Sequence, residues 1–578
     1  MVQHADLVVR RGLIIDGSGA APFEADVAIA NGRILAVGKV PGKGREEIDA
    51  RGFVVTPGFV DIHTHYDGQV TWENRLVPSS SHGVTTVVMG NCGVGFAPCR
   101  TDQHDLLIRL MEGVEDIPHP VLVDGVPWRW ETFPEYLSFL AGRHYDMDVC
   151  GYLPHSALRV FVMGRRGADR EPATPADLSD MTRLVREAMA AGAMGFSTSR
   201  TFLHRSSDGR SAPTFEADEA ELTALALALQ DCGKGAMQLI IDFDDPERAF
   251  ASMRRLVEIS RRPLSFSLFE GVLGQFSNPW AELLEWVAAA NGQGLPMKGQ
   301  VLGRAIGLMF GHELTLNPFF SVESYRALSP LPFKERIEQL GRPEVRARIL
   351  AEPIDPDPAN ILGRLVRDFE GMFLLGDPPD YEPAPDTSIA AQARRRGVSP
   401  EALAYDLMLE HDGRNLLYYA IANYAHGSLD TCLAMMRHPG SVLGLGDGGA
   451  HCGTICDGSA PTFMLTHWAR DRRRGERLPL PWIVRALSNE TARAIGLLDR
   501  GRIAPGFKAD LNVIDIDRLR LHPPEVNYDL PSGGRRLVQR ADGYAATVVN
   551  GTIVYREGQA TEALPGRLVR GPQRMPAH

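Results

Sequence analysis

A repeated pairing of short apolar strands with amphipathic helices is the feature that most limits how this chain can fold. Between residues 57 and 500 the sequence alternates β-branched runs with segments of helical period, as where GAMQLIIDF is followed by a helix through residues 248–259. Such a repeat places its strands parallel, with the helices outside them. The strand count is close to eight, so we expect a (β/α)8 barrel rather than an open sheet.

The two ends of the chain have a strand pattern instead. Both contain β-branched runs joined by an Asn-Gly pair, Asn31-Gly32 near the start and Asn550-Gly551 near the end, and Asn-Gly is a strong hairpin signal. We therefore expect the two ends to assemble into one small β-sandwich domain. Its halves would be residues 1–56 and 501–578, flanking a barrel of residues 57–500 with a loop insertion around 310–400.

The overall composition limits which molecules the protein is expected to bind. The chain has 578 residues and a formal net charge of −11, which argues against nucleic acid or an anionic membrane surface as the partner. No apolar run of about 18 residues is present, so we expect no membrane span. The start, MVQHADLVVRRG, is not typical of a signal peptide, and the seven cysteines suggest no disulfide framework. We expect a cytoplasmic protein that acts on a small molecule, and a homo-oligomer is possible.

Two histidines end the first apolar run of the middle section, in PGFVDIHTH. His63 and His65 are two residues apart, so in a strand they project to the same side. If this run is the first barrel strand, both face the barrel end where barrel enzymes keep their chemistry. Two convergent imidazoles are a strong arrangement for a metal such as zinc; the alternative is a pair of histidines with polar partners.

Two further candidate ligands follow other strand-like runs. Cys92 lies at the end of TTVVMGNCG, where it could be a thiolate ligand for zinc or an inert core residue. Asp447 ends VLGLGD, beside glycines that let the backbone turn tightly. A carboxylate there could bind a metal and accept a proton from metal-bound water, or it could only cap the next helix.

A glycine-rich loop follows Asp447 and contains His451, in GDGGAHCGTICDG. We expect His451 to line the substrate pocket, where it would polarise a carbonyl, contact the substrate or act as a replacement ligand. Cys452 and Cys456 in the same loop are expected to be packed thiols.

The stretches DLVVRRGLIIDGSG, GFVVTPGFVDIHTHYD, SSSHGVTTVVMGNCGVGFAP and GRIAPGFKADLNVID together resemble the amidohydrolase superfamily, in particular its D-aminoacylase (N-acyl-D-amino-acid deacylase) branch. The resemblance spans nearly the whole chain. It implies a zinc-dependent barrel hydrolase flanked by a β-sandwich, with one or two ions of zinc or another divalent metal. By motif, His63, His65 and Cys92 match metal ligands of the family. Asp447 matches an aspartate that is both ligand and general base, and His155 matches a histidine near the pocket.

The chain departs from this family on two strands. The family has a histidine ligand on its fifth and sixth strands, where this sequence reads GAMQLIIDFDD and RPLSFSLFEG and has no histidine. One metal could remain on the candidate ligands named above. Alternatively, Asp242, Asp244 or Glu270 could replace the lost imidazoles, or the protein could have lost catalysis.

The resulting prediction is a metal-dependent amidohydrolase that cleaves an amide bond, of the N-acyl-amino-acid type, in a small molecule. Its candidate catalytic residues are Asp447, His451 and His155. The alternatives are a hydrolase of cyclic amides or lactones on the same site and a non-catalytic binding or scaffold protein. The sequence leaves the substrate and its stereochemistry open.

Overall fold

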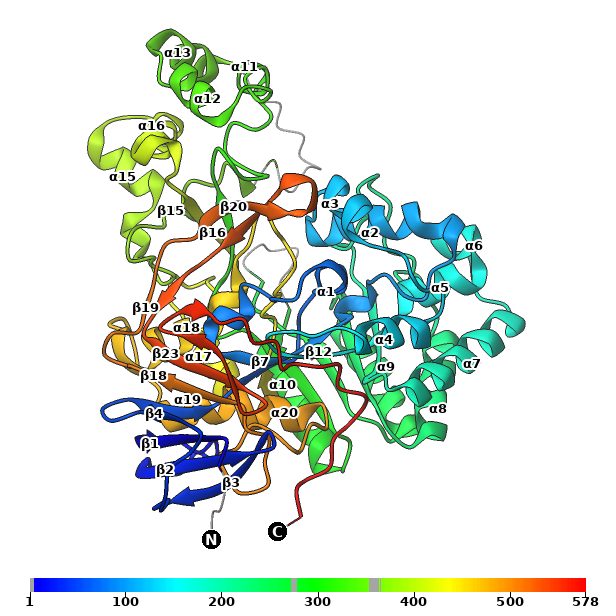
Figure 1. The fold of residues 1–578 in the computed structure, drawn as a ribbon. Helices are drawn as coiled ribbons and strands as arrows, with labels where there is room; N and C mark the ends of the chain where they lie inside the picture. Colours follow the sequence, from blue (N-terminus) through cyan, green and yellow to red (C-terminus); the bar gives the residue numbers. More distant parts are fainter. Residues whose placement is uncertain (1–4, 272–277, 353–362, 364, 578) are drawn as a thin grey trace.

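The computed structural model describes residues 5–271, 278–352, 363 and 365–577, and it has an α/β fold (Figure 1). Its centre contains two parallel sheets, one of three strands in the order β6-β7-β8 and one of six in the order β17-β13-β12-β11-β10-β9. Their bounds are β6 (Phe59–Asp61), β7 (Val84–Met89), β8 (Asp148–Gly151), β9 (Leu153–Pro154), β10 (Gly195–Arg200), β11 (Ala236–Ile241), β12 (Leu264–Ser267), β13 (Met297–Val301) and β17 (Ser441–Leu443).

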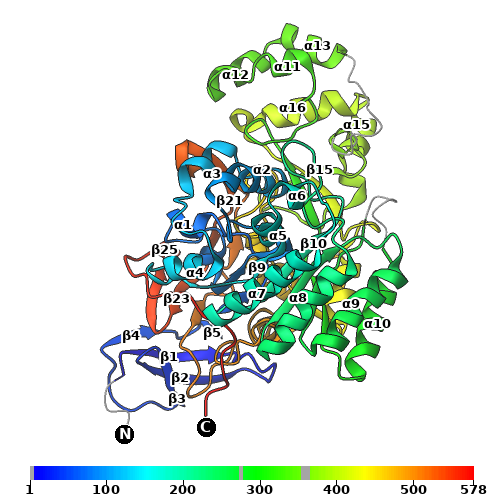
Figure 2. The same ribbon diagram turned by 90° about the vertical axis from the view of Figure 1, so that its right-hand side faces the viewer.

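Helices between these strands cover the outside of the sheets, and Figure 2 shows four of them in a row. They are α7 (Pro175–Ala191), α8 (Glu219–Cys232), α9 (Pro246–Ser260) and α10 (Trp280–Gly292). Local sequence sets their ends. At the start of α7, the Thr174 hydroxyl accepts a hydrogen bond from the Asp177 amide, and the helix stops at Gly192, whose φ is +112°. The apolar sides of these helices pack on the strands and form the main hydrophobic core.

A nine-stranded sheet combines strands from both ends of the chain, in the order β25-β24-β23-β18-β5-β1-β2-β3 with β4 beside β1. Antiparallel pairing of β5 with β18, for example Val55 opposite Val513, joins the two contributions. Both predicted Asn-Gly turns have positive φ, as a two-residue hairpin requires. The strands are β1 (Leu7–Ile14), β2 (Phe23–Ala30), β3 (Arg33–Gly38), β4 (Glu46–Asp49), β5 (Val54–Pro57), β18 (Leu511–Ile514), β23 (Tyr544–Val549), β24 (Thr552–Arg556) and β25 (Gln559–Ala560). The domain boundaries themselves stay predictions.

The region predicted as an insertion lies between β13 and β17 and has its own hydrophobic cluster, which includes Phe310, Phe319 and Tyr405. Its antiparallel sheet has the order β14-β16-β15, with helices at the end of the molecule opposite β1–β3 in both views (Figures 1 and 2). The elements are β14 (Ile306–Phe310), α11 (Glu323–Arg326), α12 (Phe333–Leu340), α13 (Pro343–Ala351), β15 (Met372–Leu374), α15 (Ile389–Arg396), α16 (Pro400–Gly413) and β16 (Leu417–Ala422).

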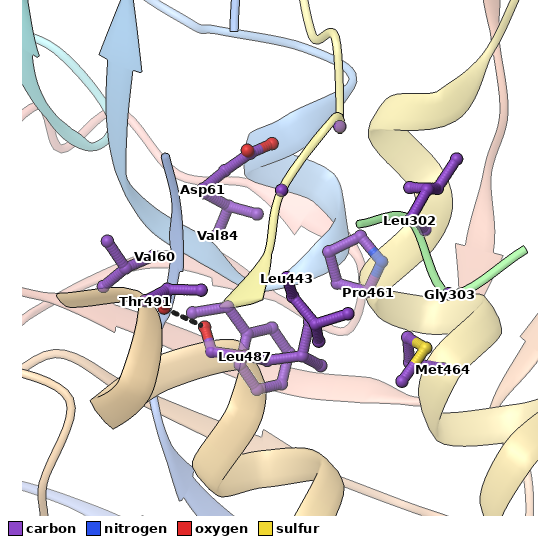
Figure 3. A pocket seen from close by; sticks show the side chains of 14 residues that line it. Val60, Asp61, Val84, Leu302, Gly303, Leu443, Pro461, Met464, Leu487 and Thr491 are labelled. Carbon is purple, nitrogen blue, oxygen red and sulfur yellow. Dashed lines mark hydrogen bonds between the residues drawn. The ribbon is translucent and has the colours of Figure 1, made fainter. Parts of the chain in front are cut away.

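A small apolar cavity lies where the central strands meet the helices that follow β17 (Figure 3). Its volume is only ≈ 40 Å³, and Val60, Leu443 and Met464 are among its lining side chains. The Thr491 hydroxyl beside it donates to the Leu487 carbonyl. A gap of this size and lining is a packing void rather than a substrate site. In the part of the chain that the structure describes, no helix combines the length and the hydrophobicity needed to cross a membrane.

Candidate metal centre

Four side chains from three separate strand ends converge at one end of the central sheets. Potential ligand atoms of His63, His65 and Cys92 all lie within 4.8 Å of one another. Asp447 Oδ1 is 3.4 Å from His63 Nε2 and 3.6 Å from His65 Nε2. Cys92 Sγ is 3.3 Å from His63 Nε2. The structure therefore brings together the four residues that the sequence singled out as candidate ligands.

Backbone pairing beyond β6 and β17 places the histidines beside the aspartate. The Asp447 amide donates to the His63 carbonyl at 3.0 Å, and the His65 amide donates to the Gly448 carbonyl at 2.8 Å. Gly446 permits this close approach, because a Cβ there would lie 2.2 Å from Asp61 Oδ2. Asp447 itself has a φ of +45°, which is uncommon for a residue with a side chain and points to local constraint.

Cys92 is held by the short turn that follows β7. It has a φ of +56°, and its amide donates to Gln238 Oε1 at 2.7 Å. The neighbouring Asn91 side chain donates to the carbonyls of Val88 and Thr64, so it fastens the turn to the segment that carries the histidines. These contacts fix the position of the thiol relative to His63.

Each histidine has another buried polar side chain beside its second ring nitrogen. His63 Nδ1 donates to Gln300 Oε1 at 2.6 Å, which leaves the lone pair of Nε2 directed at the cluster. His65 Nδ1 lies 3.1 Å from Glu115 Oε1. Glu115 and Gln300 were not anticipated from the sequence. Outer carboxylate or amide partners of this kind fix the ring orientation of metal-binding histidines.

The four residues of the cluster differ in how the surrounding protein shifts their pKa values. Burial lowers the pKa of His63 to about 4, so its imidazole is neutral. Burial also lowers the pKa of His65, but the Glu115 carboxylate and Asp447 outweigh it and raise that pKa well above its ordinary value. Burial raises the pKa of the Cys92 thiol to about 11. For Asp447, burial is outweighed by the adjacent histidines, which lower its pKa.

The donor set fits a divalent cation such as zinc. Asp447 Oδ1 and Glu115 Oε2 are buried atoms without a hydrogen-bond partner in the described parts of the chain, and such atoms are costly unless a ligand satisfies them. Nitrogen, sulfur and carboxylate oxygen are zinc ligands at about 2.0–2.3 Å, which places tetrahedral ligand atoms about 3.3–3.6 Å apart. The distances from His63 Nε2 to Cys92 Sγ and from Asp447 Oδ1 to the two histidines lie in this range.

A cavity of ≈ 290 Å³ opens beside the cluster, and His451 is one of its lining residues. His451 Nε2 lies 3.9 Å from Glu115 Oε2, and its φ is +51°. His204 also lines this cavity, and its Nδ1 shares a hydrogen bond of 2.8 Å with the Ser199 hydroxyl. His204 was missed from the sequence, although its position just after a central strand was a signal. Cys452 and Cys456 are buried, as expected for packed thiols.

His155 does not join this group, so its predicted place near the pocket needs correction. Its Nδ1 contacts the Thr198 hydroxyl at 2.9 Å, and its Nε2 contacts Glu221 Oε1 at 2.7 Å. The second oxygen of Glu221 accepts a hydrogen bond from Arg159 at 2.5 Å. With both ring nitrogens engaged in this buried network, His155 fastens α8 to the helix that it begins, α5 (His155–Met163).

The three carboxylates considered as replacement ligands also lie elsewhere. Asp242 and Asp244 line a different cavity, beside α8 and α9, and Asp242 Oδ2 accepts from the Phe202 amide. Glu270 accepts hydrogen bonds from the Ala425 amide and the Thr431 hydroxyl. Ile240 and Ser267, from the two strands that lack histidines, line the cavity beside the cluster instead.

Comparisons with known proteins identify the family of the chain. The chain matches the amidohydrolase family over residues 46–555. It is 29% identical to an uncharacterized protein of Mycobacterium tuberculosis strain H37Rv, over 96% of this chain and 92% of that protein. It is 25% identical to the D-aminoacylase of Alcaligenes xylosoxydans xylosoxydans, over 98% of both chains.

Solved structures share the fold. A D-aminoacylase, studied for its binuclear metal centre, superposes with a TM-score of 0.65 at 23% identity, covering 98% of this chain and 100% of that one. The N-acyl-D-glutamate deacylase of Bordetella bronchiseptica, complexed with zinc and a phosphonate inhibitor, gives a TM-score of 0.64 at 21% identity with the same coverage. The chain belongs to the amidohydrolase family, in its D-aminoacylase branch, and is a hydrolase of carbon–nitrogen bonds other than peptide bonds.

Proposed function

We propose that the protein binds a divalent cation, with zinc as the first choice, between His63, His65, Asp447 and Cys92, and uses it to hydrolyse an amide bond of a small molecule. The observation that carries the proposal is the convergence of two imidazole nitrogens and a thiol with a buried carboxylate oxygen that has no hydrogen-bond partner among the described residues. The zinc-containing structure of a deacylase with the same fold supports it. A bound divalent cation would supply hydroxide at neutral pH, because it lowers the pKa of bound water from near 16 to about 7.

The residues of this chain have distinct tasks in that reaction. Asp447 takes the proton of the attacking water and transfers it to the nitrogen of the leaving amine as the carbon–nitrogen bond breaks. Its lowered pKa keeps it ionised, and thus able to accept the proton, at neutral pH. His451 lines the cavity where it contacts the substrate carbonyl or its surroundings. Gln300 and Glu115 hold the two imidazoles in orientation.

We further propose that the two parallel sheets form one closed (β/α)8 barrel. β8 and β9 are separated by a single residue, so they count as one barrel strand that connects the two sheets on one side. The parallel bridge between Thr64 and Gly448 supports closure on the other side. A closed barrel would place all candidate ligands at the carboxyl ends of its strands, where barrel active sites lie. We also propose a cytoplasmic location and self-association.

Elemental analysis of the purified protein, before and after incubation with zinc, tests the proposal. We expect about one zinc ion per chain, as a site of three or four protein ligands would hold. Changing both His63 and His65 to alanine should remove the metal and all turnover of N-acyl amides. H438A, at a histidine that precedes β17 and pairs with Glu285, should change neither. Absence of metal after incubation would contradict the proposal and favour a non-catalytic scaffold. Turnover that survives the double change would exclude the metal mechanism.

A further inference from the structure

The cavity beside the candidate metal centre has an apolar wall that comes largely from the insertion. Ile306 and Leu308 of β14, Ile421 of β16 and Leu365 all line it. The central strands add Ile240 from β11. Apolar side chains in such a wall favour a ligand that removes apolar surface from water, at about 25 cal/mol per Å² buried. The wall is thus suited to a hydrocarbon group.

No lysine or arginine is found among the described residues that line this cavity. Two arginines close to lining residues in sequence have other partners, while Arg364, next to Leu365, lies outside the described residues. Arg205, next to His204, donates to the carbonyls of Phe202 and Gly209. Arg304 is fully buried and donates to Asp457 Oδ1 at 2.6 Å. Neither guanidinium is therefore available to form a bidentate pair with a substrate carboxylate.

The charged groups that do line the cavity include two carboxylates, Glu115 and Asp447. A ligand carboxylate away from the metal would meet like charge and apolar wall. The donors offered to it there are the Ser267 hydroxyl and the imidazoles of His204 and His451 rather than a guanidinium or an ammonium group. Burying an ionised carboxylate in this way is far more costly than burying an amide or a methyl group. The cavity volume of ≈ 290 Å³ lies near the small end of the range for ligand pockets, which is about 300–1,000 Å³.

We infer that this enzyme acts on an uncharged amide whose acyl or amine portion is apolar, rather than on an N-acyl amino acid with a free carboxylate. The inference rests on the proposed function, because it names the substrate class of the same site. The insertion then acts as the specificity wall, with Ile306, Leu308 and Ile421 in contact with the apolar group.

A pair of matched amides tests this inference. N-acetyl-isopentylamine is N-acetyl-leucine with its carboxyl group replaced by hydrogen, so the neutral compound lacks only the carboxylate at issue and the stereocentre that bears it. We expect kcat/KM for the neutral amide, followed by release of the amine, to exceed that for N-acetyl-D-leucine and N-acetyl-L-leucine by at least tenfold. Equal or faster cleavage of either acid would overturn the inference while leaving the hydrolase intact.

Binding separates failure of the inference from failure of the proposed function. If a metal-loaded protein cleaves neither amide, the proposed hydrolysis of simple amides is contradicted. Isothermal titration with the same compounds then decides the inference alone. Tighter binding of the neutral amide supports it, and tighter binding of an acid, or no binding of either, overturns it.

The variant L203R sharpens the test. Leu203 lines the cavity, yet it is 44% exposed, so an arginine there can place its charge at the cavity without being buried. We expect the ratio of kcat/KM, neutral over acidic, to fall at least tenfold. The matched control is L227R, because Leu227 is 40% exposed on the outer helix α8 and should leave the ratio unchanged. An unchanged ratio in L203R, with circular dichroism showing a folded protein, would contradict the inference.

Discussion

Two buried polar clusters in this protein differ in how completely their atoms are paired. One lies at the junction of the terminal sheet and the central strands, where Arg500 donates to Asp148 at 2.8 Å and to Asp499 at 2.9 Å. Lys508 in the same cluster donates to both oxygens of Asp510. The other is the candidate metal centre, where Asp447 Oδ1 has no hydrogen-bond partner among the described residues.

The difference separates a structural role from a binding role. In the cluster around Arg500 every carboxylate has a cationic partner, so burial is compensated within the chain. In the cluster around Asp447, the imidazoles of His63 and His65 and the thiol of Cys92 converge, yet Asp447 Oδ1 accepts no hydrogen bond from the described residues. Buried polar side chains that converge and still lack hydrogen-bond partners indicate a binding site for a ligand that is not part of the chain.

The largest effect should follow from D447N, which keeps the shape of the side chain and removes its charge. We expect amide hydrolysis to fall to background and the affinity for zinc to weaken, because a ligand and proton acceptor is lost. The variant should still fold, because asparagine has the same size as aspartate. Steady-state kinetics and urea unfolding check this, with the exposed D412N as control. Wild-type turnover in D447N would contradict the assignment of a binding role to this cluster and a structural role to the cluster around Arg500.

Next in size, R500A should destabilise the fold without touching the cavity. It would remove the guanidinium that Asp148 and Asp499 share, leaving Lys508 at 3.2 Å from Asp148 and Arg33 at 3.4 Å from Asp499. Removal of one partner of a buried pair costs about 3–5 kcal/mol, and the remaining cations should keep the loss near the lower end of that range. R502A is a matched control, because Arg502 is 30% exposed, its partner Asp16 is near the surface, and such pairs contribute at most ~1 kcal/mol. Equal unfolding midpoints for the two variants in urea would contradict this prediction.

A third, smaller effect concerns pH. Burial raises the pKa of Glu382, but His467 and Arg472 outweigh it, so that the pKa falls from its ordinary 4.5 to about 2. The folded state then binds its proton more weakly than the unfolded state, so this stability is present above pH 4.5 and lost as pH falls towards 2. The contribution is roughly 3 kcal/mol at neutral pH. In E382Q, urea unfolding between pH 3 and 6 should therefore show a shallower loss of stability than in the wild type. An unchanged slope would show that Glu382 does not belong with the paired carboxylates.

The smallest expected effect is that of E115Q. Gln keeps the size of the side chain but removes the negative charge beside His65, so we expect zinc affinity to fall about 10–100-fold. Competition with a chelator measures it. The control is E112Q, one turn earlier on α2 (His104–Glu115), where the carboxylate instead pairs with His119. Equal zinc affinity in both variants would mean that the charge of Glu115 does not tune the site.

Sequence periodicity predicted much of the fold and the convergence of His63 and His65, and the family resemblance added Cys92 to them. The spacing of two in a strand makes the histidines point together, and the end of a parallel strand is a reliable place for chemistry. The roles of these residues as ligands stay predictions. Periodicity could not predict contacts between segments that are distant in sequence. Gln300, the partner of His63, comes from a strand more than two hundred residues later in the chain.

Glu115 shows what signal was available for a residue that sequence reasoning missed. It lies at the i+4 position after Met111 and i+8 after Leu107, so it continues the buried side of α2. An acidic residue on the apolar side of a helix requires a partner, and here the partner is His65. His155 misled for the opposite reason, because its polar neighbours lie in α8 and β10, far away in sequence.

The pairing of β5 with β18 has a consequence for how the chain is made. During synthesis at about 5–20 residues per second, β5 emerges from the ribosome roughly 20–90 seconds before β18. Throughout that interval the valines of β5 form an unpaired strand edge, which other nascent chains can join. Because β18 is synthesised last, the free edge of β5 is a site where binding of a chaperone would prevent association between nascent chains.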